Sequence, residues 1–200
     1  MVKAPRGQII ITEGSTTTDV YLVCEGRVQI SLFSRHGREV ILRDMGVGQV
    51  FGELAAIDLQ PRSSNVTAIE DSLLAHMDRE AFVEFLGVVP QAGLWMSRLL
   101  AARIRDLTDR AFELATQPVA GRVHRELLRL IGEAGAADDR ALIQPMPTHA
   151  DFAARIGTHR EAVTRELNLL ASEGILRQTR RRVEILSVAR LQSWSDRIQR

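Results

Sequence analysis

The feature that most constrains the fold of this chain is a change in its hydrophobic period close to Met77. Before that point, recurring glycines separate short apolar runs, which is typical of a small barrel or jelly roll of short strands. After it, Asp78 is a good helix N-cap, and the following apolar residues take helical spacing. The chain is therefore predicted to be α+β, with an N-terminal β-roll (jelly roll) and a largely helical remainder.

One hairpin is clear within the predicted β-roll. Val28, Ile30 and Leu32 alternate with polar residues, which is the period of a half-buried strand. A turn at residues 35–38 and a returning strand at 40–42 complete the hairpin.

The segment after the β-roll predicts one long helix, because residues 90–115 contain no internal proline and no glycine after Gly93. Its apolar residues follow heptad spacing, which fits a dimer helix but, over two heptads, equally fits a helix packed on its own domain. This seam consists of Leu100, Ile104, Leu107, Ala111 and Leu114.

Gln117-Pro118 ends the predicted helix and gives the domain boundary. We expect an effector-sensing β-roll domain at 1–89, a dimerisation helix at 90–117 and a DNA-binding domain at 118–200.

Residues 148–186 carry the most informative local pattern. Thr148-His-Ala-Asp151 and Thr158-His-Arg-Glu161 both match a capping box, so each predicts the start of a helix. Gly157, between them, can take the left-handed conformation of a tight turn. Two short strands around an arginine-rich turn follow at 175–186. The pattern predicts a winged helix-turn-helix.

Composition excludes several functional classes. A single cysteine, Cys24, rules out a disulfide framework and a four-cysteine zinc or iron–sulfur site within one chain, and the histidines lack metal-ligand spacing. No nucleophile–base pair or Walker-type glycine loop is present, so we expect no enzyme and no metal, haem or iron–sulfur cluster.

The chain is also expected to be cytoplasmic. No apolar run approaches the length of a membrane span, and the polar first residues do not resemble a secretion signal. Residues 1–117 carry a net charge of −3 and residues 118–200 a net charge of +4. A basic C-terminal part fits either a nucleic-acid-binding module or an ordinary solvated surface.

Two stretches resemble the Crp/Fnr superfamily of bacterial transcription regulators, typified by the cyclic-AMP receptor protein and the fumarate–nitrate regulator. Residues 51–68, Phe-Gly-Glu-Leu through Val-Thr-Ala, look like the phosphate-binding cassette of cyclic-nucleotide domains. Residues 148–176 look like the DNA-reading unit of the family. Members usually carry a helix and an extra strand ahead of the first β-segment, whereas this sequence starts almost at Gly7.

The cassette suits a cyclic phosphodiester, which carries one negative charge. Arg62 can supply a charge-assisted clamp, and Gly52 lets backbone N–H groups approach closely. A short helix starting near Glu53-Leu54 would direct its N-terminal dipole at the phosphate. By resemblance, Glu53 accepts the ribose 2′-hydroxyl and Ser63 assists at the phosphate. The alternative is that Glu53 and Arg62 neutralise each other as a structural pair.

The identity of the effector is less constrained. In the cyclic-AMP-responsive branch, two adjacent hydroxyl residues of the dimer helix contact the adenine, and the matching positions here are Leu107 and Thr108. Leu107 has no hydrogen-bonding group, which leaves Thr108. Cyclic AMP is the first expectation, with cyclic GMP, a cyclic dinucleotide or no ligand as alternatives.

The resemblance also assigns DNA contacts. Arg160, Glu161 and Arg165 match the base-reading positions, where an arginine forks onto guanine and a carboxylate accepts from cytosine N4. Thr164 stands where one branch has glycine and another serine, which favours a half-site mixed between the two branches. The expected half-site is near TGTGA. Residues expected to hold phosphates are His149, His159, Arg180 and Arg181.

The expected function is a homodimeric, sequence-specific regulator that binds palindromic double-stranded DNA and contacts RNA polymerase, with an allosteric effector in the β-roll. One alternative is a ligand-independent regulator of the same fold. The other is a nucleotide-binding signalling module that acts on a protein partner, with its helix-turn-helix as the protein contact.

Overall fold

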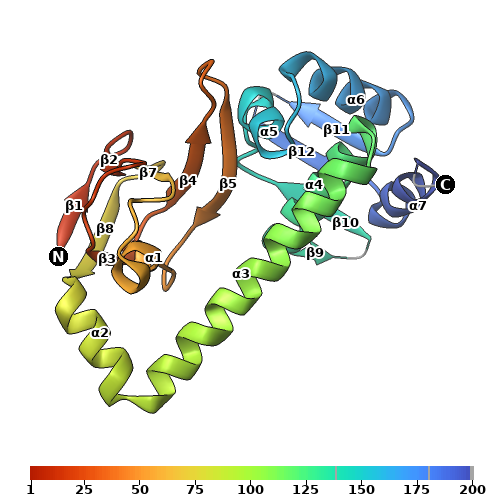
Figure 1. The fold of residues 1–200 in the computed structure, drawn as a ribbon. Helices are drawn as coiled ribbons and strands as arrows, with labels where there is room; N and C mark the ends of the chain where they lie inside the picture. The colour runs from red at the N-terminus through yellow and green to blue at the C-terminus, as the bar shows by residue number, and fades with distance from the viewer. Residues whose placement is uncertain (138, 180, 199–200) are drawn as a thin grey trace. The chain divides into compact units, whose positions relative to one another are not determined.

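The computed structural model describes residues 1–137, 139–179 and 181–198 (Figure 1). The chain forms two compact units, Met1–Arg105 and Asp106–Arg200. The long helix α3, Pro90–Thr116, begins in the first unit and ends in the second. The expected division at residues 89 and 117 stays a prediction.

Two antiparallel four-stranded sheets build the β-roll of the first unit. One has the order β1-β8-β3-β6 and the other β2-β7-β4-β5. Buried side chains of both sheets form one core, including Phe51 and Leu74 from the first sheet and Val28 and Val66 from the second. The predicted jelly roll is confirmed. The strands are β1 Val2–Ala4, β2 Ile9–Ile11, β3 Val20–Glu25, β4 Val28–Phe33, β5 Glu39–Met45, β6 Val50–Phe51, β7 Asn65–Ala68 and β8 Ser72–Met77.

The predicted hairpin is formed by β4 and β5, but its inward and outward alternation is interrupted. The register shifts between Ile30 and Ser31, because a β-bulge lies there. Ser31 is consequently buried, at 3% exposure, while Leu32 is only half-buried. The strict alternation expected from the sequence therefore holds only for the first part of the strand.

Three helices accompany the β-roll: α1 Glu53–Asp58, α2 Arg79–Val88 and the first part of α3. Asp78 is the N-cap of α2, as predicted, and its Oδ1 accepts a hydrogen bond from the Ala81 amide at 2.8 Å. Among the described residues, no single helix is long and apolar enough to span a membrane, and only α2 and α3 counted together, bent by 109°, would meet that test.

The second unit contains the expected winged helix-turn-helix. Its core joins residues of α4, α5, α6 and a four-stranded sheet of order β11-β12-β10-β9, including Leu127, Phe152, Val163 and Ile185. The elements are α4 Val119–Ala134, β9 Ala136–Ala137, β10 Arg140–Ile143, α5 His149–Arg155, α6 Arg160–Ser172, β11 Leu176–Thr179, β12 Arg182–Ile185 and α7 Val188–Ile198.

The two predicted capping boxes have different outcomes. Thr148 is the N-cap of α5 and accepts a hydrogen bond from the Asp151 amide at 3.1 Å, as expected. The second prediction is wrong, because α6 begins one residue later and its N-cap is His159, whose side chain makes no capping hydrogen bond. The tight turn before it does contain Gly157 in the left-handed conformation, at φ 64°.

Candidate effector-binding cassette and DNA-reading face

The cassette, residues 51–68, is built around a close approach at Gly52, the N-cap of α1. Gly52 has φ 84°, a conformation that strongly favours glycine. A Cβ at this position would lie 2.8 Å from the carbonyl oxygen of Asp19 and 2.9 Å from Nη1 of Arg62. Both the conformation and the space therefore require glycine here.

Arg62 is buried, at 4% exposure, and is held by the chain itself. Its Nη1 donates to the carbonyl of Gly52 and its Nη2 to the carbonyl of Asp19, each at 2.8 Å, while Nε donates to Oγ1 of Thr17 at 3.0 Å. Burial lowers the pKa of the guanidinium, against the opposing effect of nearby groups that include Asp19 and Glu53.

The number of hydrogen-bond donors that Arg62 retains for a ligand follows from its geometry and could not be predicted from local sequence patterns. A guanidinium has five N–H groups. Three of them meet the partners above, so one hydrogen remains on each of Nη1 and Nη2. These two can meet two oxygens of one phosphate, which is the bidentate contact that suits this group.

Glu53 is the second buried charge of the cassette, at 2% exposure. It forms an ion pair with Arg103 of α3, which also donates to the carbonyl of Val50 at 2.5 Å. Sequence reasoning missed Arg103, since nothing in the sequence links positions fifty residues apart. Glu53 and Arg62 thus have separate partners, rather than serving only to neutralise each other.

The remaining predicted effector residues are accessible. Leu54 and Ser63 are exposed beside the buried pair, and Thr108 is exposed on α3 within the second unit. The cassette thus offers spare guanidinium hydrogens for an anion and a carboxylate for a hydroxyl. This donor set fits a cyclic nucleotide, and Arg62, Glu53 and Ser63 are the residues that would hold it.

The other candidate site is the outer side of α6. Val163, Leu167 and Leu170 are fully buried against the core, which turns the opposite side of the helix outward. That side borders an open hollow of about 580 Å³. We call its residues the reading face: Arg160, Glu161, Thr164, Arg165 and Asn168.

The four predicted phosphate contacts lie before and after the reading face in the sequence. His149 of α5 is half-buried, whereas His159 and Arg181 are exposed. The amide of Met146 donates to the carbonyl of Arg181 at 3.0 Å, which ties the wing turn to the segment before α5. Arg180 lies outside the described residues.

A buried histidine supports the reading helix from behind. His124 of α4 is fully buried, and its Nε2 lies 2.7 Å from Oε1 of Glu166 on α6. Burial lowers the pKa of His124, although the carboxylate of Glu166 opposes that shift. The imidazole is therefore neutral at pH 7 and donates one hydrogen bond to α6.

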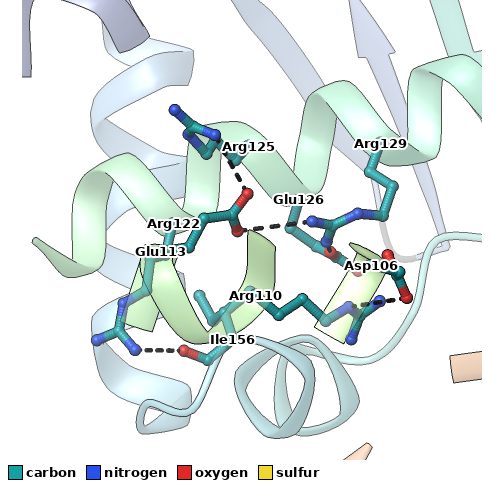
Figure 2. Close-up of polar contacts among 8 residues, drawn as sticks. All are labelled: Asp106, Arg110, Glu113, Arg122, Arg125, Glu126, Arg129 and Ile156. Carbon is teal, nitrogen blue, oxygen red and sulfur yellow. Dashed lines mark hydrogen bonds and ion pairs between the residues drawn. The ribbon is translucent and has the colours of Figure 1, made fainter. Parts of the chain in front are cut away.

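Figure 2 shows a second support, where the end of α3 meets α4 within the second unit. Glu113 lies between two arginines of α4, 3.2 Å from Nη1 of Arg125 and 3.5 Å from Nη2 of Arg129. Arg129 also pairs with the buried Glu126. Nearby, Nη1 of Arg122 donates to the carbonyl of Ile156 at 2.7 Å.

The hydrogen bond from Arg122 links α4 to the turn before α6. Ile156 directly precedes Gly157, and a Cβ on Gly157 would lie 3.0 Å from Cδ2 of Leu114 and 3.4 Å from Nη1 of Arg122. The end of α3, α4 and the turn are therefore closely packed here, and the left-handed conformation of Gly157, at φ 64°, favours glycine at this position. Among the described residues, no group of three or more His, Cys, Asp or Glu side chains could hold a metal ion.

Comparison with known proteins matches both candidate sites. The family model for the cyclic nucleotide-binding domain matches residues 1–87, and that for the Crp-like helix-turn-helix domain matches residues 121–194. The CRP-like cAMP-activated global transcriptional regulator of Mycobacterium tuberculosis is 32% identical over 191 residues, covering 95% of this chain and 85% of that protein.

Two further proteins extend the comparison. The cyclic AMP receptor protein of Thermus thermophilus is 31% identical over 190 residues, covering 94% of this chain and 84% of that protein. The structure of FixK2 from Bradyrhizobium japonicum matches with a TM-score of 0.81 at 22% identity, over 96% of this chain and 94% of that chain, and shows a shared fold. The chain thus belongs to the Crp/Fnr superfamily and is a Crp-like transcription regulator with a cyclic nucleotide-binding domain and a DNA-binding helix-turn-helix.

Proposed function

We propose that this regulator is a homodimer whose cassette binds a cyclic nucleotide, with cAMP the first candidate, and that the effector sets how two reading faces engage a palindromic operator. In this proposal Arg62 and Ser63 bind the phosphate and Glu53 binds the ribose hydroxyl. Cyclic AMP activates the M. tuberculosis relative according to its name, which supports that candidate. A cytoplasmic location and a contact with RNA polymerase belong to the same proposal.

The proposal that the cassette binds an effector rests on the hydrogen-bond partners of Arg62. Burying a guanidinium is costly, and this one is held by two carbonyls and a hydroxyl with one hydrogen left on each terminal nitrogen. An anion that accepts those two hydrogens would complete the set. Glu53 is held beside it by Arg103 and presents a carboxylate, a hydrogen-bond acceptor, to a sugar hydroxyl.

The same observation favours a second candidate function. Arg62 has three partners within the chain itself, two carbonyls and a hydroxyl, so the protein alone holds this side chain in place. A regulator that binds DNA without an effector is consistent with that arrangement. In the other alternative, a signalling module that acts on a protein partner, the reading face would bind that protein and would select no DNA sequence.

Calorimetric titration with cAMP, cyclic GMP and a cyclic dinucleotide tests the effector. We expect cAMP to bind, 2′-deoxy-cAMP to bind more weakly because Glu53 loses its donor, and Ser63→Ala to weaken binding. Ser64→Ala is the matched control, because Ser64 is the next residue and has no assigned contact. Saturating cAMP should strengthen binding to an operator selected from a random DNA pool.

Three results would contradict parts of this proposal. If no cyclic nucleotide binds and the protein selects a palindrome unaided, it is a ligand-independent regulator. If no DNA sequence is enriched with or without nucleotide, the module acts on another kind of partner. If Ser64→Ala weakens nucleotide binding as much as Ser63→Ala, the phosphate lies elsewhere in the cassette.

A further inference from the structure

Within the described part of the chain, Thr164 is the residue of the reading face whose hydroxyl lies between two polar neighbours of the protein. Its Oγ1 lies 3.0 Å from the carbonyl oxygen of Arg160, one helical turn earlier, and 2.8 Å from Nδ1 of His149 on α5. The side chain is half-buried and borders the hollow at the reading face.

The hydroxyl hydrogen of Thr164 is used in either tautomer of His149. If Nδ1 carries a hydrogen, it donates to Oγ1, and the hydroxyl donates to the carbonyl of Arg160. If Nδ1 is bare, the hydroxyl donates to it instead. Burial, followed by the charge of Arg160, lowers the pKa of His149, so one of these two neutral forms is present near pH 7.

The hydroxyl therefore has no hydrogen left for a base. Acceptors in the major groove, such as thymine O4 or purine N7, need a donor and so would gain nothing from this group. The other heavy atom on Cβ of threonine is the Cγ2 methyl. With Oγ1 held between α5 and the preceding turn, Cγ2 is the part of Thr164 that remains to face the hollow.

We propose that Thr164 determines specificity through its methyl group, which contacts the 5-methyl of a thymine in the half-site, while its hydroxyl is fixed by His149 and the carbonyl of Arg160. His149 thus acts as a positioning residue for base reading. Apolar contact with the thymine methyl is an established mode of direct readout, and threonine is among the residues that supply it. This inference rests on sequence-specific DNA binding by α6.

Replacing thymine by deoxyuridine removes only the 5-methyl group and leaves every hydrogen-bonding atom of the base. In the selected operator, each half-site thymine on either strand would be replaced singly, and affinity measured by fluorescence anisotropy. We expect one position at which the wild-type protein loses about fourfold in affinity per half-site, the cost of about one buried methyl-sized group.

Two variants assign that loss to Thr164. Thr164→Ser keeps the hydroxyl and removes the methyl, so it should bind the thymine and deoxyuridine operators equally. Thr164→Val keeps a methyl and removes the hydroxyl, so it should retain the preference for thymine, with weaker binding overall because His149 loses its partner. Thr116→Ser is the matched control, because Thr116 is exposed, lies outside the reading face and makes the same hydroxyl-to-carbonyl contact, to Phe112 at 2.8 Å.

The outcomes separate this inference from the proposed function. If the wild-type protein selects an operator but deoxyuridine is neutral at every position, the methyl contact is absent and only this inference fails. It also fails if Thr164→Ser stays sensitive to deoxyuridine, or if Thr164→Val loses the preference and Thr164→Ser keeps it, since the hydroxyl would then read the base. If no sequence is selected at all, the proposed DNA recognition itself fails.

Discussion

At the scale of single residues, the charged groups of the cassette stabilise the fold in addition to forming a candidate binding site. Replacing Arg62 with leucine would strand the carbonyls of Gly52 and Asp19 in a buried place, at a cost of about 1–3 kcal/mol for each unsatisfied group. The variant would therefore weaken the β-roll as well as remove the proposed anion contact. Ser63 is exposed, and varying it tests the phosphate contact alone.

His124 is expected to make the free energy of unfolding depend on pH. Its pKa is lowered in the folded chain by burial, while in the unfolded chain it is close to the ordinary value of about 6.5. The unfolded state therefore binds more protons in the range between these two values. The contribution of neutral His124 to the free energy of unfolding is fully present above about pH 6.5. It is lost as the pH falls through that value towards the lowered pKa.

We expect the free energy of unfolding of the second unit to decrease from pH 7.5 to pH 5.5, with a contribution from His124 of at most about 1.4 kcal/mol per pH unit. Urea denaturation followed by circular dichroism at several pH values measures it. His124→Gln keeps a donor for Glu166 and cannot titrate, so its curve should be flatter. Equal slopes for the two proteins would mean that His124 does not carry the effect.

At the scale of elements, the sequence predicted most starts and ends, because capping and period are local properties. Thr148 and Asp78 were found as N-caps, and the helix-turn-helix lies where its apolar spacing indicated. The start of α6 was missed by one residue, because Thr158 and His159 can both precede a helix and packing decides between them. The bulge after Ile30 left no local signal in the alternation.

The seam on α3 is the element-scale feature that calls for a partner. Ile104 is 64% exposed, Leu107 46% and Leu114 53%, and Ala111 is also exposed. The first seam residue, Leu100, is half-buried and packs against a core cluster of its own unit. Exposed apolar residues at this spacing fit a two-helix coiled coil between subunits. The alternative, in which the seam packs inside its own subunit, would require these side chains to be buried.

Ile104→Asp should convert the dimer to a monomer and remove tight operator binding, because it places a carboxylate in the seam. Its folded monomer should be little affected, since Ile104 is largely exposed in the single chain. Light scattering measures the mass, and circular dichroism checks the helices. Ala102→Asp adds the same charge at an exposed position off the seam and should stay dimeric. An Ile104→Asp protein that remained dimeric would place the dimer contact elsewhere.

At the scale of the whole molecule, contacts between distant positions could not be predicted from the sequence. Arg103 beside Glu53, His124 behind Glu166 and Glu113 between two arginines of α4 all join segments whose local patterns are independent. Composition and periodicity describe one element at a time, whereas an ion pair depends on how elements pack. The residue types of the candidate sites were readable from motifs, and their supporting partners were not.

The proposed dimer leads to one prediction about how its contacts with DNA divide between bases and phosphates. Two-fold symmetry would place the reading faces in successive major grooves, roughly 34 Å apart. Each subunit would then contribute a base-reading set on α6 and a phosphate contact from the wing. We expect Arg165, which borders the hollow at the reading face, to belong to the first group, and Arg181, exposed between β11 and β12, to belong to the second.

Arg165→Ala should cost about 1–3 kcal/mol per half-site and relax discrimination mainly at one guanine. Arg181→Ala should weaken specific and non-specific DNA alike and reduce the slope of log K against log salt by about one per subunit. A phosphate contact releases a counterion wherever it forms, whereas an arginine fork is satisfied only at the right base pair. Competition binding with point-substituted half-sites at several salt concentrations measures both quantities. If Arg165→Ala lowered affinity equally for every half-site variant, Arg165 would be a phosphate contact and not a base contact.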